Sequence, residues 1–260
     1  MTLLAFQQAL CELIGSPDLC LQTREDPEPF LVRYDLSARE RERLTEIVWQ
    51  KGMSTNCTLY RSNRITPIYT LLHYTCVTLG DRLGATLDAY WAATELRDLE
   101  FKHEIHRFAR FLGDQIEQGA IADPFLAEVL EFEIALNELR FAPRRAILRQ
   151  LARQIGTASQ SQDLRIHPLM RVVRFRHEPA LLLDALARGR VPRELPDAES
   201  YLLLSVLGEG VTVHGLEPEP GGILWQLQRD RTSPQRGGLG DFVASGILLP
   251  AAALQSPVES

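Results

Sequence analysis

The sequence predicts an α+β protein, with a mainly helical domain over residues 1–155 and a small mixed domain over residues 166–230. Apolar residues recur at three- and four-residue steps through the first part, which is the spacing of amphipathic helices. After a polar linker at 156–165 the period changes, and strand-forming residues alternate with arginines at 170–177. This change sets the predicted domain boundary, whereas the tail over 231–260 shows no clear period.

The first 70 residues predict several short helices joined by turns. Residues 2–14 carry an apolar stripe that predicts the first helix. Two prolines follow, and they predict a loop with a short extended piece at 30–34. Ser37 is predicted to be an N-cap, because Glu40 stands three residues later and completes a capping box. Residues 54–63 predict one more short helix.

Proline, glycine and aspartate mark the helix boundaries through the middle of the chain. Pro67 is predicted to lie in the first turn of a new helix, where its missing N–H is not needed. Gly80 predicts a break before a helix that Asp81 caps. Asp98 is expected to cap the most strongly amphipathic helix of the chain. Two further helices are expected at 124–139 and 143–155, the second of them rich in arginine.

The small C-terminal domain is predicted to have the order strand–helix–strand–strand–helix. The predicted elements are a strand at 170–177, a helix at 179–187, strands at 201–207 and 211–216, and a helix that follows Pro220. A glycine-rich turn separates the last two strands, so they are expected to form a hairpin.

The composition is that of a soluble globular protein without a broad electrostatic affinity for nucleic acid. Hydrophobic residues make up 45% of the chain and charged residues 24%, and the net charge is -6. The N-terminus lacks a basic start, and no stretch reaches the ~20 apolar residues of a membrane span. None of the four cysteines forms a C-x-x-C pair, so we expect reduced thiols and a cytoplasmic protein.

Glu100 and His103 are the strongest metal-ligand candidates in the sequence. Their three-residue spacing brings a carboxylate and an imidazole to one metal in di-iron helical bundles. Such a site needs a second pair, and Arg107 stands where the second histidine belongs. The solvated face of an amphipathic helix explains these residues equally well. We therefore predict neither a metal site nor a catalytic residue in this chain.

Asn56, Tyr60, Arg61 and Arg64 form the first candidate binding site. A helix would point Arg61 and Arg64 to one side, because they lie three residues apart. Their guanidinium groups fit two roles, either surface ion pairs with nearby acids or a clamp for a peptide and its terminal carboxylate. The residues alone leave both roles open.

The strand at 170–177 is the second candidate binding site, through Val172, Arg174 and Arg176. A strand at the edge of a sheet offers unpaired amides to an extended peptide, and the two arginines would attract an acidic one. The alternative is a central strand whose arginines only face solvent. The sequence leaves these two readings open as well.

Three stretches of the chain together resemble a known family. They are residues 56–64, residues 98–104 with 108–112, and residues 171–179 with 201–204. In these stretches the chain resembles the partner proteins of multinuclear iron enzymes that modify cysteine in ribosomally made peptides. Known members act in methanobactin and 3-thiaglutamate biosynthesis. The resemblance covers most of residues 1–228, and the length is more similar to that of the 3-thiaglutamate partner.

The resemblance implies a division of labour between two subunits. A separate barrel-shaped subunit would hold the iron and oxidise cysteine with dioxygen, whereas this chain would carry no cofactor. This chain would bind the leader of the precursor peptide and the iron subunit, with Glu100, His103 and Arg107 as candidate partner-facing residues. Its C-terminal domain would be similar to a winged-helix peptide-recognition element.

The family implies two alternative reactions. In the 3-thiaglutamate case the β-carbon of a C-terminal cysteine is excised on a carrier peptide, and in the methanobactin case an oxazolone and a thioamide form. Two other function classes stay open. One is a helical DNA-binding regulatory protein, against which the net charge of -6 argues, and the other is a stand-alone metalloenzyme using Glu100 and His103.

Overall fold

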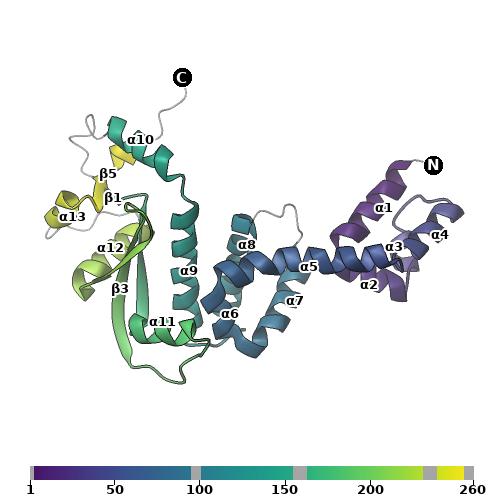
Figure 1. Ribbon diagram of the computed structural model, residues 1–260, viewed down its shortest axis with the longest axis horizontal. Helices are drawn as coiled ribbons and strands as arrows, with labels where there is room; N and C mark the ends of the chain where they lie inside the picture. Colours follow the sequence, from purple (N-terminus) through teal and green to yellow (C-terminus); the bar gives the residue numbers. More distant parts are fainter. Residues whose placement is uncertain (1–2, 95–100, 155–162, 231–238, 255–260) are drawn as a thin grey trace. The chain divides into compact units, whose positions relative to one another are not determined.

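A computed structural model of the chain describes residues 3–94, 101–154, 163–230 and 239–254. The described chain is mixed α+β, with helices through its N-terminal part and a small sheet in its C-terminal part (Figure 1). It forms two compact units, Met1–Thr70 with Trp91–Glu104 and Leu71–Tyr90 with Ile105–Ser260. This division differs from the predicted boundary at residue 155, because helices that precede residue 155 pack against the sheet.

The first unit is built from short helices around one apolar core. The helices are α1 (Leu3–Gly15), α2 (Pro17–Glu25), α3 (Glu28–Leu31), α4 (Ala38–Ile47) and the greater part of α5 (Lys51–Leu71). Their core is formed mainly by Ala9, Leu13, Cys20, Phe30, Leu44 and Val48. The predicted capping box at the start of α4 is confirmed, with both the Ser37 and the Glu40 side chains bonded to backbone amides.

The predicted extended piece at 30–34 is wrong, because residues 28–31 form the helical turn α3. Pro27 and Pro29 stand at the beginning of this turn, where no N–H donor is required. The turn buries Phe30 and Leu31, and the amide of Leu31 donates to the Pro27 carbonyl at 3.0 Å. The two prolines therefore start a helical turn instead of excluding one.

The predicted break before Pro67 is also wrong, because α5 is continuous from Lys51 to Leu71. A proline inside a helix removes one hydrogen bond and crowds the preceding turn. Here Pro67 is buried together with Ile68 and Arg64, so tertiary packing offsets the local cost. The helix ends four residues later, where Leu72 leaves the helical conformation with φ -122° and ψ 45°.

Helices also make up much of the second unit. The remaining helical segments before the sheet are α6 (His73–Leu79), η1 (Gly80–Arg82), α7 (Leu83–Ala93), α8 (Phe101–Glu117), α9 (Leu126–Phe141) and α10 (Arg144–Gln154). Of these, the end of α7 from Trp91 and the start of α8 up to Glu104 belong to the first unit. The break at Gly80 is confirmed, and this residue has a positive φ of 52°. Asp123 accepts hydrogen bonds from the amides of Phe125 and Leu126 at the start of α9. The predicted cap Asp98 lies outside the described residues.

A three-stranded antiparallel sheet has the order β2 (Met170–His177), β3 (Asp197–Ser205) and β4 (Thr212–Leu216). The predicted strand at 170–177 and the β3–β4 hairpin are confirmed. Two helices accompany the strands, α11 (Pro179–Ala187), which the sequence predicted with these bounds, and α12 (Pro218–Asp230).

A second, two-stranded sheet was not predicted from the sequence. It pairs β1 (Leu164–Ile166) with β5 (Leu248–Pro250), and α13 (Gly240–Ala244) and η2 (Ala251–Leu254) flank β5. Three residues are too few to show a period of two, so neither strand had a sequence signal. Part of the tail at 231–260, which shows no clear period in the sequence, therefore forms helices and a strand.

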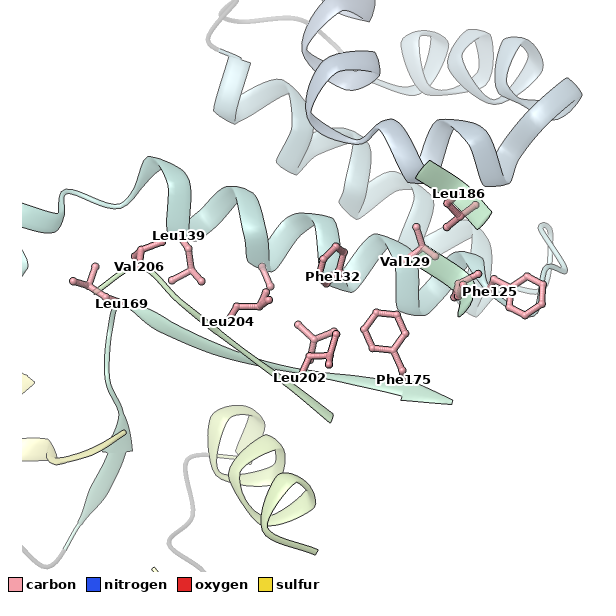
Figure 2. Packing of buried hydrophobic residues seen from close by; sticks show 13 residues of the cluster. Phe125, Val129, Phe132, Leu139, Leu169, Phe175, Leu186, Leu202, Leu204 and Val206 are labelled. Atoms are coloured by element: carbon pink, nitrogen blue, oxygen red, sulfur yellow. The ribbon is translucent and has the colours of Figure 1, made fainter. Parts of the chain in front are cut away.

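The three-stranded sheet is covered on both faces. On one face Val129, Phe132 and Leu139 of α9 pack against Phe175, Leu202 and Leu204, as Figure 2 shows. On the other face α12 contributes Leu224 and Leu227, which pack with Val172, Tyr201 and Leu203. Gly221 allows this close approach, because a Cβ there would lie 2.5 Å from the Tyr201 Cβ.

Polar side chains of α9 anchor neighbouring backbone. Glu133 accepts hydrogen bonds from the Tyr74 amide at 2.8 Å and the Thr75 amide at 2.7 Å, at the start of α6. Burial raises the pKa of Glu133 to about 7, although these two amides act in the opposite direction. Glu128 similarly accepts from the Arg176 amide at 2.6 Å.

In the described part of the chain, no helix is both long and apolar enough to span a membrane.

Candidate functional site

A cavity of about 710 Å³ lies in the first unit, within the usual size range of ligand pockets. Its walls come from the end of α1, the start of α2, the middle of α5 and the end of α7. Three of the predicted binding residues, Tyr60, Arg61 and Arg64, line this cavity. The structure thus brings together most of the first predicted site.

Arg64 forms the inner wall of the cavity and is held by buried neighbours. Its Nε donates to the Glu104 Oε1 at 2.8 Å, and both side chains are less than 5% exposed. The guanidinium also lies 6.0 Å from the Tyr60 ring and 5.7 Å from the Trp91 ring, which permits cation–π contacts. Burial raises the pKa of Tyr60, so this hydroxyl stays protonated. Arg64 is therefore held in place by its buried partners and lines the cavity with a fixed side chain.

Arg61 lies toward solvent on the same helix and is paired with Asp18 of α2. Its side chain is 42% exposed, so the ion pair is screened and weak. A second ion pair at the cavity joins Arg33 to Glu12 at 2.6 Å. An incoming carboxylate would therefore compete with Asp18 for Arg61.

Trp91 contributes a hydrogen-bond donor to the cavity wall. Its indole Nε1 is buried, and no acceptor for it is found among the residues that the structure describes. A buried donor without an acceptor costs about 1–3 kcal/mol. A ligand that brings a carbonyl or carboxylate oxygen to this wall would recover that cost.

Asn56 has a different position from the other three residues of the first predicted site. Its Nδ2 donates to the Ile14 carbonyl at 3.1 Å, near the C-terminal end of α1. The last carbonyls of a helix have no partner within the helix, so this bond satisfies one of them. Asn56 is therefore placed to hold α1 against α5.

The second predicted site, β2, is an edge strand whose outward backbone groups are partly occupied. The Gln228 carboxamide accepts from the Val172 amide at 2.9 Å and donates to the Val172 carbonyl at 3.0 Å. Glu128 occupies the amide of Arg176 at 2.6 Å. Val172 and Arg176 therefore offer no open amide to an added strand, and the Val172 side chain is fully buried.

The two predicted arginines of β2 have different environments. Arg174 pairs with Glu199 at 2.8 Å, and its guanidinium lies 5.3 Å from the Trp225 ring. The Arg176 side chain is exposed. Arg176 is thus the more accessible of the two to an acidic peptide, because the Arg174 side chain is 35% exposed and already paired.

The opposite edge of the sheet, β4, is open. In an antiparallel pair, residues alternate between pointing their backbone groups toward the partner strand and away from it. The Val172 groups point away from β3, so those of its pair Leu203 point toward β4 and bond with His214. By alternation, the backbone groups of Val213 and Gly215 point outward. Within the described ranges, no strand pairs with β4 on that side.

The partner-facing candidates lie on or next to α8. The side chain of His103 is exposed and that of Arg107 is half-buried, whereas Glu100 lies outside the described residues. Among the residues with described side chains, no three of the histidines, cysteines, aspartates and glutamates gather as metal ligands.

Comparison with known proteins gives no independent identification. No protein-family model matches the chain, and no curated protein matches it. Asp18, Trp91 and the open edge of β4 were not predicted from the sequence as parts of a binding site. Gly215 was the available signal for β4, because a glycine inside a strand often marks the close approach of another backbone. Asp18 and Trp91 are distant in sequence from Arg61 and Arg64, and had no local signal.

Proposed function

We propose that this chain is a non-catalytic, peptide-recruiting subunit. In this proposal it binds the leader of a ribosomally made precursor peptide and presents the peptide's cysteine to an iron-dependent oxygenase subunit. The proposed chemistry is excision of the β-carbon from a C-terminal cysteine, as in 3-thiaglutamate biosynthesis. The methanobactin-type reaction is the alternative. The iron belongs to the partner, and the proposed location is the cytoplasm, where ribosomal peptides are made.

The observation that carries the proposal is the open edge of β4. Outward-facing amides and carbonyls at Val213 and Gly215 provide the hydrogen bonds that an extended peptide needs when it joins a sheet. The side chains of residues 212–215 are exposed, and Gly215 has no atom within 4 Å of an added Cβ. Residues 212–215 are therefore accessible in the described part of the chain.

The order of elements supports a winged-helix-like recognition domain. Strand β2, helix α11, the β3–β4 hairpin and helix α12 follow one another, with the hairpin at one border of the sheet. In this proposal the peptide binds at β4, and not at β2, where a peptide-binding edge was one of the two interpretations of the sequence. The cavity beside Arg61 and Trp91 supplies a second contact with acceptor groups of the peptide.

Calorimetry with one matched pair of variants tests the peptide-binding step. The ligand is the leader of a precursor peptide encoded beside this chain. Val213→Pro removes the outward N–H at an edge position where proline is tolerated, whereas Val213→Thr retains it. We expect Val213→Pro to weaken leader binding about tenfold, the effect of ~1.4 kcal/mol, and Val213→Thr to bind normally. Equal affinity of the two variants would exclude strand addition at β4.

Co-expression tests the division of labour. With the neighbouring genes present, an iron-containing protein should co-purify with this chain, and peptide modification should require both proteins. Peptide modification by this chain in the absence of the iron protein would contradict the proposal.

One observation favours a second function, binding of duplex DNA. Helix α10 carries four arginines and no acidic residue, and the side chains of Arg145, Arg149 and Arg153 are exposed. Such a helix can neutralise phosphates, although the chain as a whole has a charge of -6. A salt-dependent mobility shift of duplex DNA, lost in Arg145→Gln/Arg149→Gln, would support this function. No shift at low salt would exclude it.

A further inference from the structure

Two cysteines face each other in the core of the first unit. Cys20 is on α2 and Cys57 is on α5, and Cys57 packs against the core cluster that contains Cys20. The side-chain pairs Arg24–Ser54 and Asp18–Arg61 join the same turns of α2 and α5. Cys20 is fully buried, whereas Cys57 is partly exposed. All four cysteines of the chain lie in described segments, and none of them forms a disulfide. The two thiols are thus adjacent and reduced, although 36 residues separate them in the sequence.

A guanidinium group accompanies this pair. Arg24 lies one turn after Cys20 on α2, and its charge acts to lower the pKa of the Cys20 thiol, against the larger effect of burial. Its Nη2 also donates to the Ser54 Oγ on α5 at 2.7 Å, and its Nε donates to the Val48 carbonyl. Arg24 is therefore fixed by α5 and by the end of α4. A cation held beside a thiol favours the thiolate form.

We propose that Cys20 and Cys57 form a modification site, at which a hydroperoxide oxidises the pair to a reversible intramolecular disulfide. The proposal rests on the packing of the two cysteines across α2 and α5 and on the unequal exposure of Cys20 and Cys57. It is independent of the peptide-recruiting function.

The unequal exposure assigns the order of the two steps. Cys57 reaches solvent, so its sulfur attacks the peroxide, takes one oxygen as a sulfenic acid and releases one water. The Cys20 sulfur then attacks the Cys57 sulfur, the S–O bond breaks, and a second water leaves. The two thiols lose two protons and two electrons, and one hydrogen peroxide is reduced to two waters. Burial raises the pKa of Cys20 to about 11, so little of its thiolate is present and Cys20 is not the thiol that attacks the peroxide first.

The disulfide would connect two walls of the cavity. Asp18 and Leu19 of α2 line it, and so do Tyr60 and Arg61 of α5, one turn from Cys57. A covalent bond between α2 and α5 would fix the separation of these walls. Oxidation would therefore change ligand access to the cavity, and a thiol reductant would restore it.

Intact-mass analysis of the full-length chain tests the site. The protein is reduced, freed of reductant and treated with hydrogen peroxide at near-stoichiometric amounts. We expect a loss of two hydrogens per chain, a peptide map that links Cys20 to Cys57, and reversal by dithiothreitol. Cys57→Ser should abolish the loss of two hydrogens, whereas Cys11→Ser and Cys76→Ser should retain it.

A second variant tests the order of the steps. In Cys20→Ser, the sulfenic acid on Cys57 has no partner, so it should persist and react with dimedone. If this variant does not fold, the mass of the wild type and of Cys57→Ser still decides the question. A wild type that gains oxygen without losing two hydrogens would overturn the proposal. A bond that joins Cys11 to Cys57, or two chains through Cys11, would overturn it as well.

Discussion

The two edges of the three-stranded sheet differ in what occupies their outward backbone groups. On β2, the side chains of Gln228 and Glu128 bond to Val172 and Arg176. On β4, the groups of Val213 and Gly215 face outward with no strand beside them in the described chain. An exposed strand edge is a liability unless it is covered or used. In the described chain, one edge of the sheet is therefore covered by the protein's own side chains, whereas the other edge is open.

The same contrast separates two arginines that lie one turn apart on α5. Arg64 is 4% exposed and bonded to Glu104, whereas Arg61 is 42% exposed and paired with Asp18. The buried pair is isolated from solvent, so its partners depend on each other strongly. The exposed pair is screened and can exchange partners. In each unit, one polar group is thus occupied by another part of the chain, whereas a comparable group remains accessible to solvent.

The largest expected effect comes from breaking the buried pair. Glu104→Ala leaves the Arg64 guanidinium buried without its carboxylate, and we expect a loss of about 3–5 kcal/mol in the free energy of unfolding. Asp18→Ala breaks the exposed pair and should cost about 1 kcal/mol or less. Urea unfolding followed by circular dichroism measures both values. Equal losses of unfolding free energy in the two variants would contradict the proposal that the Arg64 pair contributes more to stability than the Arg61 pair.

Glu133 gives the next effect, because it also occupies backbone amides. Its pKa is raised from 4.5 to about 7, so the folded state holds the proton more tightly than the unfolded state. Stability is therefore greatest below pH 4.5 for this group and falls as the pH rises toward 7 and above. At ~1.4 kcal/mol per pKa unit, the loss is about 3 kcal/mol.

Glu133→Gln tests this pH dependence, because the carboxamide does not titrate. The denaturant midpoint, measured at several pH values between about pH 5 and pH 8, should fall with rising pH for the wild type and change less for the variant. The variant should also be less stable at low pH, since its amide group replaces one of the two acceptor oxygens that bind Tyr74 and Thr75. Parallel pH profiles of the two proteins would show that Glu133 does not titrate in this range.

Local features of the fold could be predicted from the sequence. The capping box at Ser37, the helix Pro179–Ala187 and the β3–β4 hairpin each depend on residues that are close along the chain. The role of α9 could not be predicted, because Glu128 and Glu133 bond to residues 48 and 58 positions away. The helix break predicted at Pro67 was wrong for a related reason. Burial of Arg64, Pro67 and Ile68 offsets the local tendency of proline to end a helix.

The candidate sites could be predicted only in part. The three-residue spacing placed Arg61 and Arg64 on one helix, but the buried partner Glu104 is 40 positions from Arg64. The strand signal at 170–177 was correct, but its edge is covered by Gln228, which is 56 positions from Val172. Sequence periodicity predicts which residues form a strand, and it does not show which side chain reaches the strand's outer border.

Gln228→Leu should convert the covered edge into an open one. The amide and carbonyl of Val172 would lose their partners, and we expect a loss of about 1–3 kcal/mol in the free energy of unfolding. Gln226→Leu is the matched control, because Gln226 lies on the same helix and is exposed. Amide hydrogen exchange should show faster exchange at Val172 in Gln228→Leu only. Unchanged exchange there would mean that another group covers this edge.

The smallest expected effect concerns the exchange of partners at Arg61. Asp18→Asn removes the carboxylate that competes with a ligand, so a precursor peptide with a carboxylate terminus should bind the full chain more tightly, by about two- to fivefold. Arg61→Gln should weaken binding by a similar factor. The same peptide with an amidated C-terminus is the control, because it lacks the charge that Arg61 would bind. If calorimetry finds that both termini respond equally to Asp18→Asn, the substitution acts on the shape of the cavity and Arg61 is not a carboxylate site. If only the carboxylate responds, the accessible arginine of α5 has the ligand role that its buried neighbour Arg64, already bonded to Glu104, does not have.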